Sequence, residues 1–182
     1  MNSTGPQGGA LDPRLHFVVA TAIVVKPRTG PAGSGTGTGQ GRRFEYLIAK
    51  RAPHETAFPN KWTVPGGKLV THEYQHLPKK FGFPQWYRVV DWVLRKEVRE
   101  EVGLEIGTPR FVTDLVFIRP DGYPVVTLSF WAPYQSGEVK LCKDLTEYSW
   151  VTLEEAKGYD LIEGIWDEIR LVDERLRTIE RY

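Results

Sequence analysis

The sequence predicts an α/β (α+β) fold in which a mixed β-sheet is sandwiched between helices. Residues 17–25 are β-branched and almost continuously apolar, which is typical of a strand buried on both faces and therefore central in a sheet. Residues 89–102 carry apolar side chains four residues apart, and residues 161–177 carry them at alternating spacings of three and four, as in helices that pack one face on a sheet. Strands before and between these two helices complete a layered α/β arrangement.

The length and composition indicate one globular domain. A chain of 182 residues can bury one sizeable core but not two comfortable ones. Its hydrophobic content of 41% and charged content of 26% are ordinary for a globular protein. We assign the domain to residues 15–182 and expect residues 1–14, which are small, polar and contain glycine and proline, to form a flexible leader.

Charge, cysteine content and hydropathy exclude several classes of function. The formal net charge is +1, and the basic pairs at 42–43 and 79–80 are only local, whereas binding a nucleic-acid backbone requires clustered cations. The lone Cys142 cannot form an internal disulfide. Residues 1–14 lack the cationic and apolar regions of a signal peptide, and no run of eighteen apolar residues occurs. We expect a cytoplasmic protein with neither a nucleic-acid nor a membrane partner.

Glycine and proline mark two connections between strands. Residues 28–42 hold six glycines but match no phosphate-binding loop, because neither glycine template occurs there and strands lie on both sides. We expect a glycine-rich loop that leads to a second strand at 44–50. Farther along, strands at 110–118 and 125–132 flank an Asp-Gly turn at 120–123 and form a β-hairpin.

Capping residues predict where two helices begin or end. Gly103 is placed to end the helix at 89–102 in the left-handed conformation. A short strand at 147–152 ends in Thr152, which with Glu155 forms a Thr-x-x-Glu capping box for the next turn.

Three carboxylates lie on one face of the first predicted helix. Glu97, Glu100 and Glu101 are spaced so that their side chains are helical neighbours, and their mutual repulsion weakens an isolated helix. A bound cation offsets that repulsion, and carboxylate oxygens on a rigid helix suit Mg²⁺ or Mn²⁺. The alternative is a solvated acidic surface.

The segment before this helix favours the metal site. Residues 62–69 read Trp-Thr-Val-Pro-Gly-Gly-Lys-Leu, and five residues separate Gly67 from Glu73. Together with residues 96–104, Lys-Glu-Val-Arg-Glu-Glu-Val-Gly-Leu, this pattern resembles the signature of the Nudix hydrolases. The resemblance implies the Nudix fold and hydrolysis, with divalent cations, of a nucleoside diphosphate linked to another moiety X.

Two features depart from the family pattern. The seven-residue spacer of the family corresponds here to the 22 residues at 74–95, so an insertion of about fifteen residues, at 74–88, lies inside the box. The family arginine is Lys96, which brings one point charge where arginine brings a planar fork. We expect Lys96 to pair with Glu73; in the alternative, Arg95 takes this role.

The resemblance also implies the residues of the site. It assigns the metal to four residues, namely Gly66 through its carbonyl oxygen, Glu97, Glu100 and Glu101. Glu73 would orient the loop from behind these ligands. The general base of the family comes either from the glutamates of the box or from a late acid, and for the second case the candidate is Glu147, whose alternative is a surface glutamate at a strand edge.

Other polar residues carry weaker signals. Arg51, at the end of the second strand, would contact a phosphate or lie exposed on the surface. His54, His72 and His76 lack the paired helical spacing of a zinc site.

The insertion is too aromatic for a solvated linker. It contains Phe81, Phe83, Trp86 and Tyr87, so these rings must pack on something. They either cover the core or the partner in a homodimer, or they form one wall of the substrate pocket and stack on a nucleobase.

The moiety X is the least determined part of the prediction. The loop sequence and the compact size are similar to those of the branch that cleaves nucleoside triphosphates, including oxidised ones, to monophosphate and pyrophosphate. Pro120 is similar to a downstream proline of ADP-ribose pyrophosphatases, so an ADP-ribose or nucleotide-sugar pyrophosphatase is the alternative. A non-catalytic nucleotide sensor is a third reading, although such proteins typically lose glutamates that this chain keeps.

Overall fold

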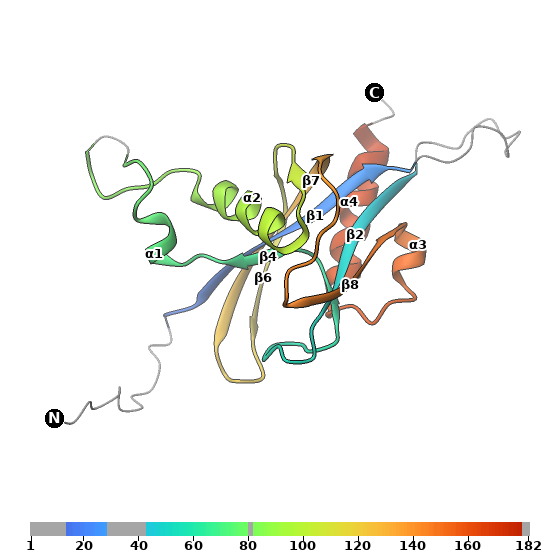
Figure 1. Ribbon diagram of the computed structural model, residues 1–182, viewed down its shortest axis with the longest axis horizontal. Helices are drawn as coiled ribbons and strands as arrows, with labels where there is room; N and C mark the ends of the chain where they lie inside the picture. Colours follow the sequence, from blue (N-terminus) through green and yellow to red (C-terminus); the bar gives the residue numbers. More distant parts are fainter. Residues whose placement is uncertain (1–13, 29–42, 80–81, 180–182) are drawn as a thin grey trace, which may run out of the picture.

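The computed structural model describes residues 14–28, 43–79 and 82–179, which form a mixed sheet with helices on both of its faces (Figure 1). Apart from Arg14 and Arg28, the expected leader at 1–14 and the expected glycine-rich loop at 28–42 lie outside the described residues.

The sheet is built around two long neighbouring strands, β1 (Phe17–Pro27) and β7 (Pro124–Ser136), which run parallel to each other. The order along the sheet is β3-β2-β1-β7-β5, with β4 beside β1, β6 beside β7 and β8 beside β2. The remaining strands are β2 (Phe44–Arg51), β3 (Trp62–Thr63), β4 (Gly66–Lys68), β5 (Glu105–Ile106), β6 (Arg110–Ile118) and β8 (Leu145–Val151).

The central position predicted for the first strand is confirmed. Successive side chains of a strand point to opposite faces of the sheet. Ile23 and Val25 accordingly enter one apolar cluster, whereas Ala22 and Val24 enter the other. Because both faces are covered, apolar residues are needed at every position of this stretch, which explains why the sequence shows no alternation.

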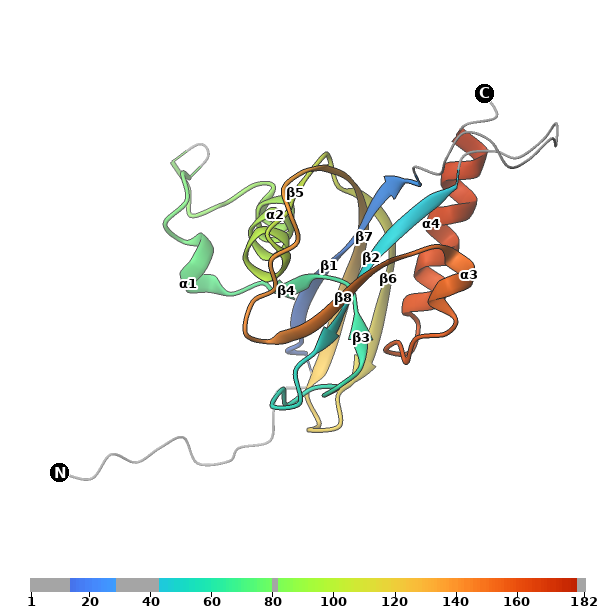
Figure 2. The ribbon, with the colours of Figure 1, turned by 45° about the vertical axis from the view of Figure 1, so that its right-hand side comes forward.

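One long helix covers each face of the sheet. Helix α2 (Val89–Val102) buries Leu94 and Val98 in the cluster on one side, and α4 (Ile165–Ile179) buries Ile169 and Val172 in the cluster on the other. Figure 2 shows the two helices on opposite sides of the strands. Two single-turn helices complete the described fold, α1 (Thr71–Tyr74) and α3 (Leu153–Ala156). None of the helices in the described ranges is long and apolar enough to cross a membrane.

The predicted caps are present. Gly103 ends α2 with a φ of 73°, and its N–H donates to the Arg99 carbonyl oxygen at 3.0 Å. A side chain at this position would be strained, because L-residues rarely adopt that φ. Thr152 and Glu155 form the reciprocal capping box at the start of α3.

The second long helix begins four residues later than predicted. Leu161 forms an isolated parallel bridge with Trp62, and the Ile162 N–H donates to the Trp62 carbonyl oxygen at 2.9 Å. Gly164 then turns the chain with a φ of 92°. The apolar periodicity at 161–164 is therefore real, but contacts with β3 hold these residues outside the helix and a glycine precedes its start.

A buried polar network fastens α4 to the sheet. The Tyr46 hydroxyl donates to Asp173 Oδ1 at 2.9 Å, and Arg177 Nε donates to Asp173 Oδ2. Both Tyr46 and Asp173 are almost fully buried.

Replacing Asp173 with alanine should lower the free energy of unfolding by about 3 kcal/mol, because it leaves a buried hydroxyl without its acceptor and deletes an ion pair. Urea denaturation measures the loss. Glu174→Gln, on the exposed side of the same helix, is the control and should change stability by less than about 0.5 kcal/mol. A loss below about 1 kcal/mol for Asp173→Ala would show that the network is not stabilising.

Candidate active site

A cavity of about 1020 Å³ lies on the sheet face that carries α4 and extends to the carboxylates of α2. Strands β1, β4, β6 and β7, the loop after β2 and the start of α4 all contribute to its wall. The polar residues of the wall that matter below are Arg51, Gly66, Glu97, Glu101, Arg119 and Glu168.

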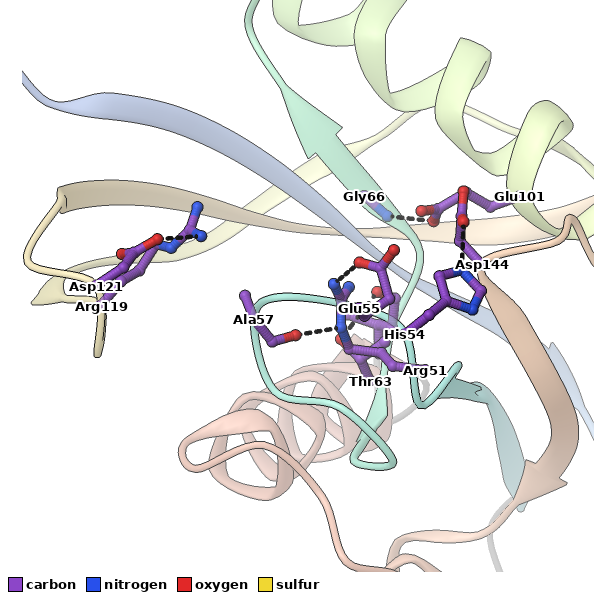
Figure 3. A network of polar contacts seen from close by, with 11 residues as sticks. Arg51, His54, Glu55, Ala57, Thr63, Gly66, Glu101, Arg119, Asp121 and Asp144 are labelled. Atoms are coloured by element: carbon purple, nitrogen blue, oxygen red, sulfur yellow. Dashed lines mark hydrogen bonds and ion pairs between the residues drawn. The ribbon is translucent and has the colours of Figure 1, made fainter.

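Close backbone packing brings the glycine loop against the acidic helix. Strand β4 pairs with β1, and the Gly66 N–H donates to Glu101 Oε2 at 2.9 Å (Figure 3). A Cβ atom on Gly66 would lie 2.4 Å from the Ala20 carbonyl oxygen, and one on Gly67 would lie 2.2 Å from the carboxyl carbon of Glu97. Backbone atoms leave no room for a side chain at Gly66, whereas a side chain at Gly67 would push the Glu97 carboxylate aside, so both glycines help to set the distance between the loop and the carboxylates.

Burial raises the pKa of the Glu101 carboxyl. Desolvation raises its pKa from 4.5 to about 7; the hydrogen bond from the Gly66 N–H lowers it, and the nearby charge of Glu97 raises it further. A nearby positive charge would therefore favour the ionised form of Glu101.

Lys96 stands at the centre of three carboxylates. Its Nζ lies 3.3 Å from Glu73 Oε2, 3.0 Å from Glu97 Oε1 and 3.1 Å from Glu100 Oε2. Desolvation opposes its charge, but the hydrogen bonds to these carboxylates outweigh it and raise the pKa of Lys96 above its ordinary value. The contact with Glu73 is the one predicted from the sequence.

Arg95 does not take this role. Its guanidinium pairs with Asp91 at 3.3 Å and donates to the carbonyl oxygens of Ile106 at 2.6 Å and Gly107 at 3.1 Å. The alternative partner for Glu73 is thus wrong, since these contacts hold Arg95 over the chain that follows α2.

The donor set fits a hard divalent cation. Glu73, Glu97 and Glu100 share a single ammonium, and the Glu101 carboxylate receives only a backbone N–H. The cluster therefore carries excess negative charge and offers only oxygen donors, which suits Mg²⁺ or Mn²⁺ rather than a soft metal.

Lys96→Met should lower kcat/KM about 10- to 100-fold, because it frees Glu73 and leaves the metal-facing carboxylates without the group that holds their spacing. Lys96→Arg is the matched control and should retain activity within a few-fold, since guanidinium can make the same ion pair. Steady-state kinetics on both variants measure the difference. Wild-type activity in Lys96→Met would show that Lys96 does not contribute to the site.

A second polar cluster occupies the loop after β2. Arg51 donates to the Ala57 carbonyl oxygen at 2.8 Å and pairs with Glu55, while His54 Nε2 lies 3.1 Å from Asp144 Oδ1 (Figure 3). Arg51, His54 and Glu55 line the cavity, so the surface alternative for Arg51 is wrong. The ligand atoms of His54, Glu55 and Asp144 lie within 4.8 Å of one another.

The position of Glu147 does not fit the role of a general base. Glu147 lies on β8, where its register partner across β2 is Lys50, and its carboxylate pairs with the Lys50 ammonium at 2.7 Å. It is exposed and does not line the cavity. This corrects the prediction for Glu147: the strand turns its side chain toward a surface lysine, as in the alternative of a strand-edge glutamate.

The insertion lies apart from the cavity. Among the described residues at 74–88, none lines the cavity wall, so the expected substrate wall is also wrong. The Trp86 ring packs at 5.4 Å on that of Tyr74, and its Nε1–H donates to the Leu77 carbonyl oxygen. Figure 1 shows this part of the chain beyond α2, away from α4.

Part of the insertion reaches the start of the acidic helix, where the His76 and Trp92 rings lie 6.4 Å apart. Phe83 and Tyr87 remain exposed. Its aromatic residues therefore pack partly on one another and on α2.

The chain resembles known proteins in sequence and in fold. No protein-family model matches the chain. The chain is 28% identical over 126 residues to nucleoside triphosphatase NudI of Klebsiella pneumoniae, covering 64% of this chain and 79% of that protein.

Solved structures with the same fold include the MutT protein of Methanosarcina mazei Go1, with a TM-score of 0.60, 22% identity, and coverage of 90% of this chain and 97% of that one. The NUDIX domain of Shewanella oneidensis NrtR complexed with ADP ribose has a TM-score of 0.62 and 14% identity, covering 92% and 94%. These likenesses confirm the predicted fold class.

Proposed function

We propose that the chain is a Nudix hydrolase and that it hydrolyses a nucleoside triphosphate to the monophosphate and pyrophosphate with the help of Mg²⁺ or Mn²⁺. The observation that carries this proposal is the placement of Glu97, Glu101 and the two loop glycines in the wall of one cavity. The similarity to a protein named nucleoside triphosphatase supports the choice of substrate.

The proposed chemistry divides between a metal ion and the chain. Four residues would hold the ion: Gly66 through its carbonyl oxygen, Glu97, Glu100 and Glu101. When bound, it supplies neutralisation of phosphate charge and a water of lowered pKa. Lys96 holds Glu73 and thereby keeps the loop against the helix. Because Glu147 lies outside the cavity, the proton acceptor in this proposal is a glutamate of the box.

A second candidate substrate is ADP-ribose. Pro120 and the cationic Arg119 lie in the cavity wall on the β6–β7 turn, and the Shewanella domain with the same fold is complexed with ADP ribose. An arginine in the wall is suited to a phosphate or a sugar hydroxyl. Both reactions cleave a phosphoanhydride bond, and they differ in the group released with the nucleoside monophosphate, which is pyrophosphate in the first case and ribose phosphate in the second.

Product analysis separates these proposals. The protein is incubated with Mg²⁺ and, one at a time, nucleoside triphosphates, ADP-ribose, dinucleoside polyphosphates and sugar nucleotides, and the products are resolved by anion exchange. We expect monophosphate and pyrophosphate from a triphosphate and no turnover in EDTA. AMP with ribose phosphate would favour ADP-ribose. Binding without turnover of any substrate would favour the nucleotide sensor.

A further inference from the structure

A buried acid lies in the cavity wall outside the metal-binding box. Glu168, in the first turn of α4, is 8% exposed, and Ser129 on β7 is fully buried. The Ser129 hydroxyl donates to Glu168 Oε2 at 2.5 Å. In the described part of the chain Glu168 Oε1 receives no hydrogen bond, and a methyl group on Gly164, another wall residue, would lie 3.9 Å from it.

An acid in this position weakens the fold. Burial raises the pKa of Glu168, which shows that the ionised form is disfavoured there, and one hydroxyl satisfies only part of its hydrogen-bonding capacity. Of the other α4 side chains that are buried against the sheet, Asp173 is paired with Tyr46 and Arg177, and the rest are apolar. A costly acid in a cavity wall, with one oxygen left without a donor, indicates recognition of a ligand.

The surroundings of Glu168 suit a flat apolar ring. Ile165, Val64 and Leu115 line the same cavity, together with Phe58 and Phe117, whose ring centroids lie 6.2 Å apart. Aromatic and aliphatic side chains of this kind stack on the faces of nucleobases, which leaves a polar edge of the base to be read by a hydrogen-bonding group.

Strand register separates Ser129, and with it Glu168, from the loop glycine Gly66 by about the length of a nucleoside. Ser129 pairs with Thr21 on β1, and Thr21 pairs with Gly66 on β4. Neighbouring strands are about 4.8 Å apart, so Ser129 and Gly66 are roughly 10 Å from each other across the sheet. A ribose can bridge a phosphate at the Gly66 end and a base at the Glu168 end.

We propose that Glu168, held by Ser129, forms a nucleobase subsite in which its free oxygen accepts a hydrogen bond from an exocyclic amino group. This inference rests on the proposed function, because it places the phosphates at the carboxylates of α2. Bases that carry an amino group are accordingly preferred to their keto counterparts, which would set a carbonyl oxygen against the carboxylate.

Nucleotide pairs that differ mainly by one amino group test the proposal. CTP is compared with UTP, and ATP with ITP, by kcat/KM with Mg²⁺ and by dissociation constants without metal. We expect the amino member to be preferred about 10-fold or more in at least one pair, because a hydrogen bond to a charged group contributes this much. Equal constants within every pair would overturn the subsite.

Glu168→Gln is the decisive variant. Its amide oxygen can still accept from Ser129, but its NH₂ then faces the cavity as a donor, so the preference should reverse in the same pair. Glu174→Gln, on the exposed side of α4, is the matched control and should leave the preference unchanged. Ser129→Ala should weaken the preference by freeing the carboxylate, and thermal melting checks that each variant is folded.

The outcomes separate this inference from the proposed function. Selective binding that reverses in Glu168→Gln, without any turnover, would support the subsite and refute the hydrolase proposal. Turnover of all nucleotides with equal constants would support the hydrolase proposal and refute the subsite. A folded Glu168→Gln variant with the wild-type preference, or a wild-type protein that prefers the keto members, overturns the subsite.

Discussion

Replacing Glu101 with glutamine is expected to lower kcat about a thousandfold, because it removes a charged metal ligand whose contribution to the transition state is several kcal/mol. The fold should persist, since the glutamine amide oxygen can still accept from the Gly66 N–H. Glu100→Gln should act in the same direction, although Glu100 is the more exposed of the two.

Glu105→Gln is the control for this experiment. Glu105 is an exposed acid just after α2 that pairs with Arg99, so it has the same charge near the same helix without lining the cavity. Steady-state turnover and titration with Mn²⁺ are measured for each variant. Wild-type turnover in both Glu100→Gln and Glu101→Gln would show that these residues do not bind the catalytic metal.

Local chemistry explains what could be predicted from the sequence. The bounds of α2 and its end at Gly103 follow from apolar spacing and from a glycine that adopts a positive φ. The ion pair between Glu73 and Lys96 could be predicted across the insertion, because the two halves of the box are each recognisable without the spacer. Each of these inferences uses residues that are close in sequence or fixed by one motif.

The features that could not be predicted from the sequence depend on contacts between residues that are far apart in the chain. His54 and Asp144 are 90 positions apart, so no spacing rule connects them. In the sequence Glu168 has the features of an ordinary acid on an amphipathic helix, and the Ser129 hydroxyl that donates to it in the fold is 39 positions away. The prediction for Glu147 was wrong for the opposite reason. Its place in the sequence suggested a catalytic acid, but strand pairing places it opposite Lys50.

The metal-free protein is expected to lose stability as the pH rises from 4.5 through about 7. The folded-state pKa of Glu101 is raised to about 7, so the folded form binds this proton more tightly than the unfolded chain does. The resulting stabilisation is fully present below pH 4.5 and is lost as the pH rises through about 7. A shift of this size corresponds to about 3 kcal/mol. Glu168, whose pKa burial also raises, adds to the loss in the same direction.

Mg²⁺ or Mn²⁺ should offset this loss, because a cation favours the ionised form of Glu101 and stabilises only the folded protein. The rise in Tm caused by the metal should therefore be small at pH 5.5 and several degrees larger at pH 8. Glu101→Gln should remove most of the metal effect and the share of the pH dependence that Glu101 contributes, whereas Glu174→Gln should keep both. Thermal melts of the three proteins with and without metal provide the measurement. An equal metal-induced shift at both pH values, or an unchanged pH dependence in Glu101→Gln, would show that Glu101 does not couple protonation to metal binding.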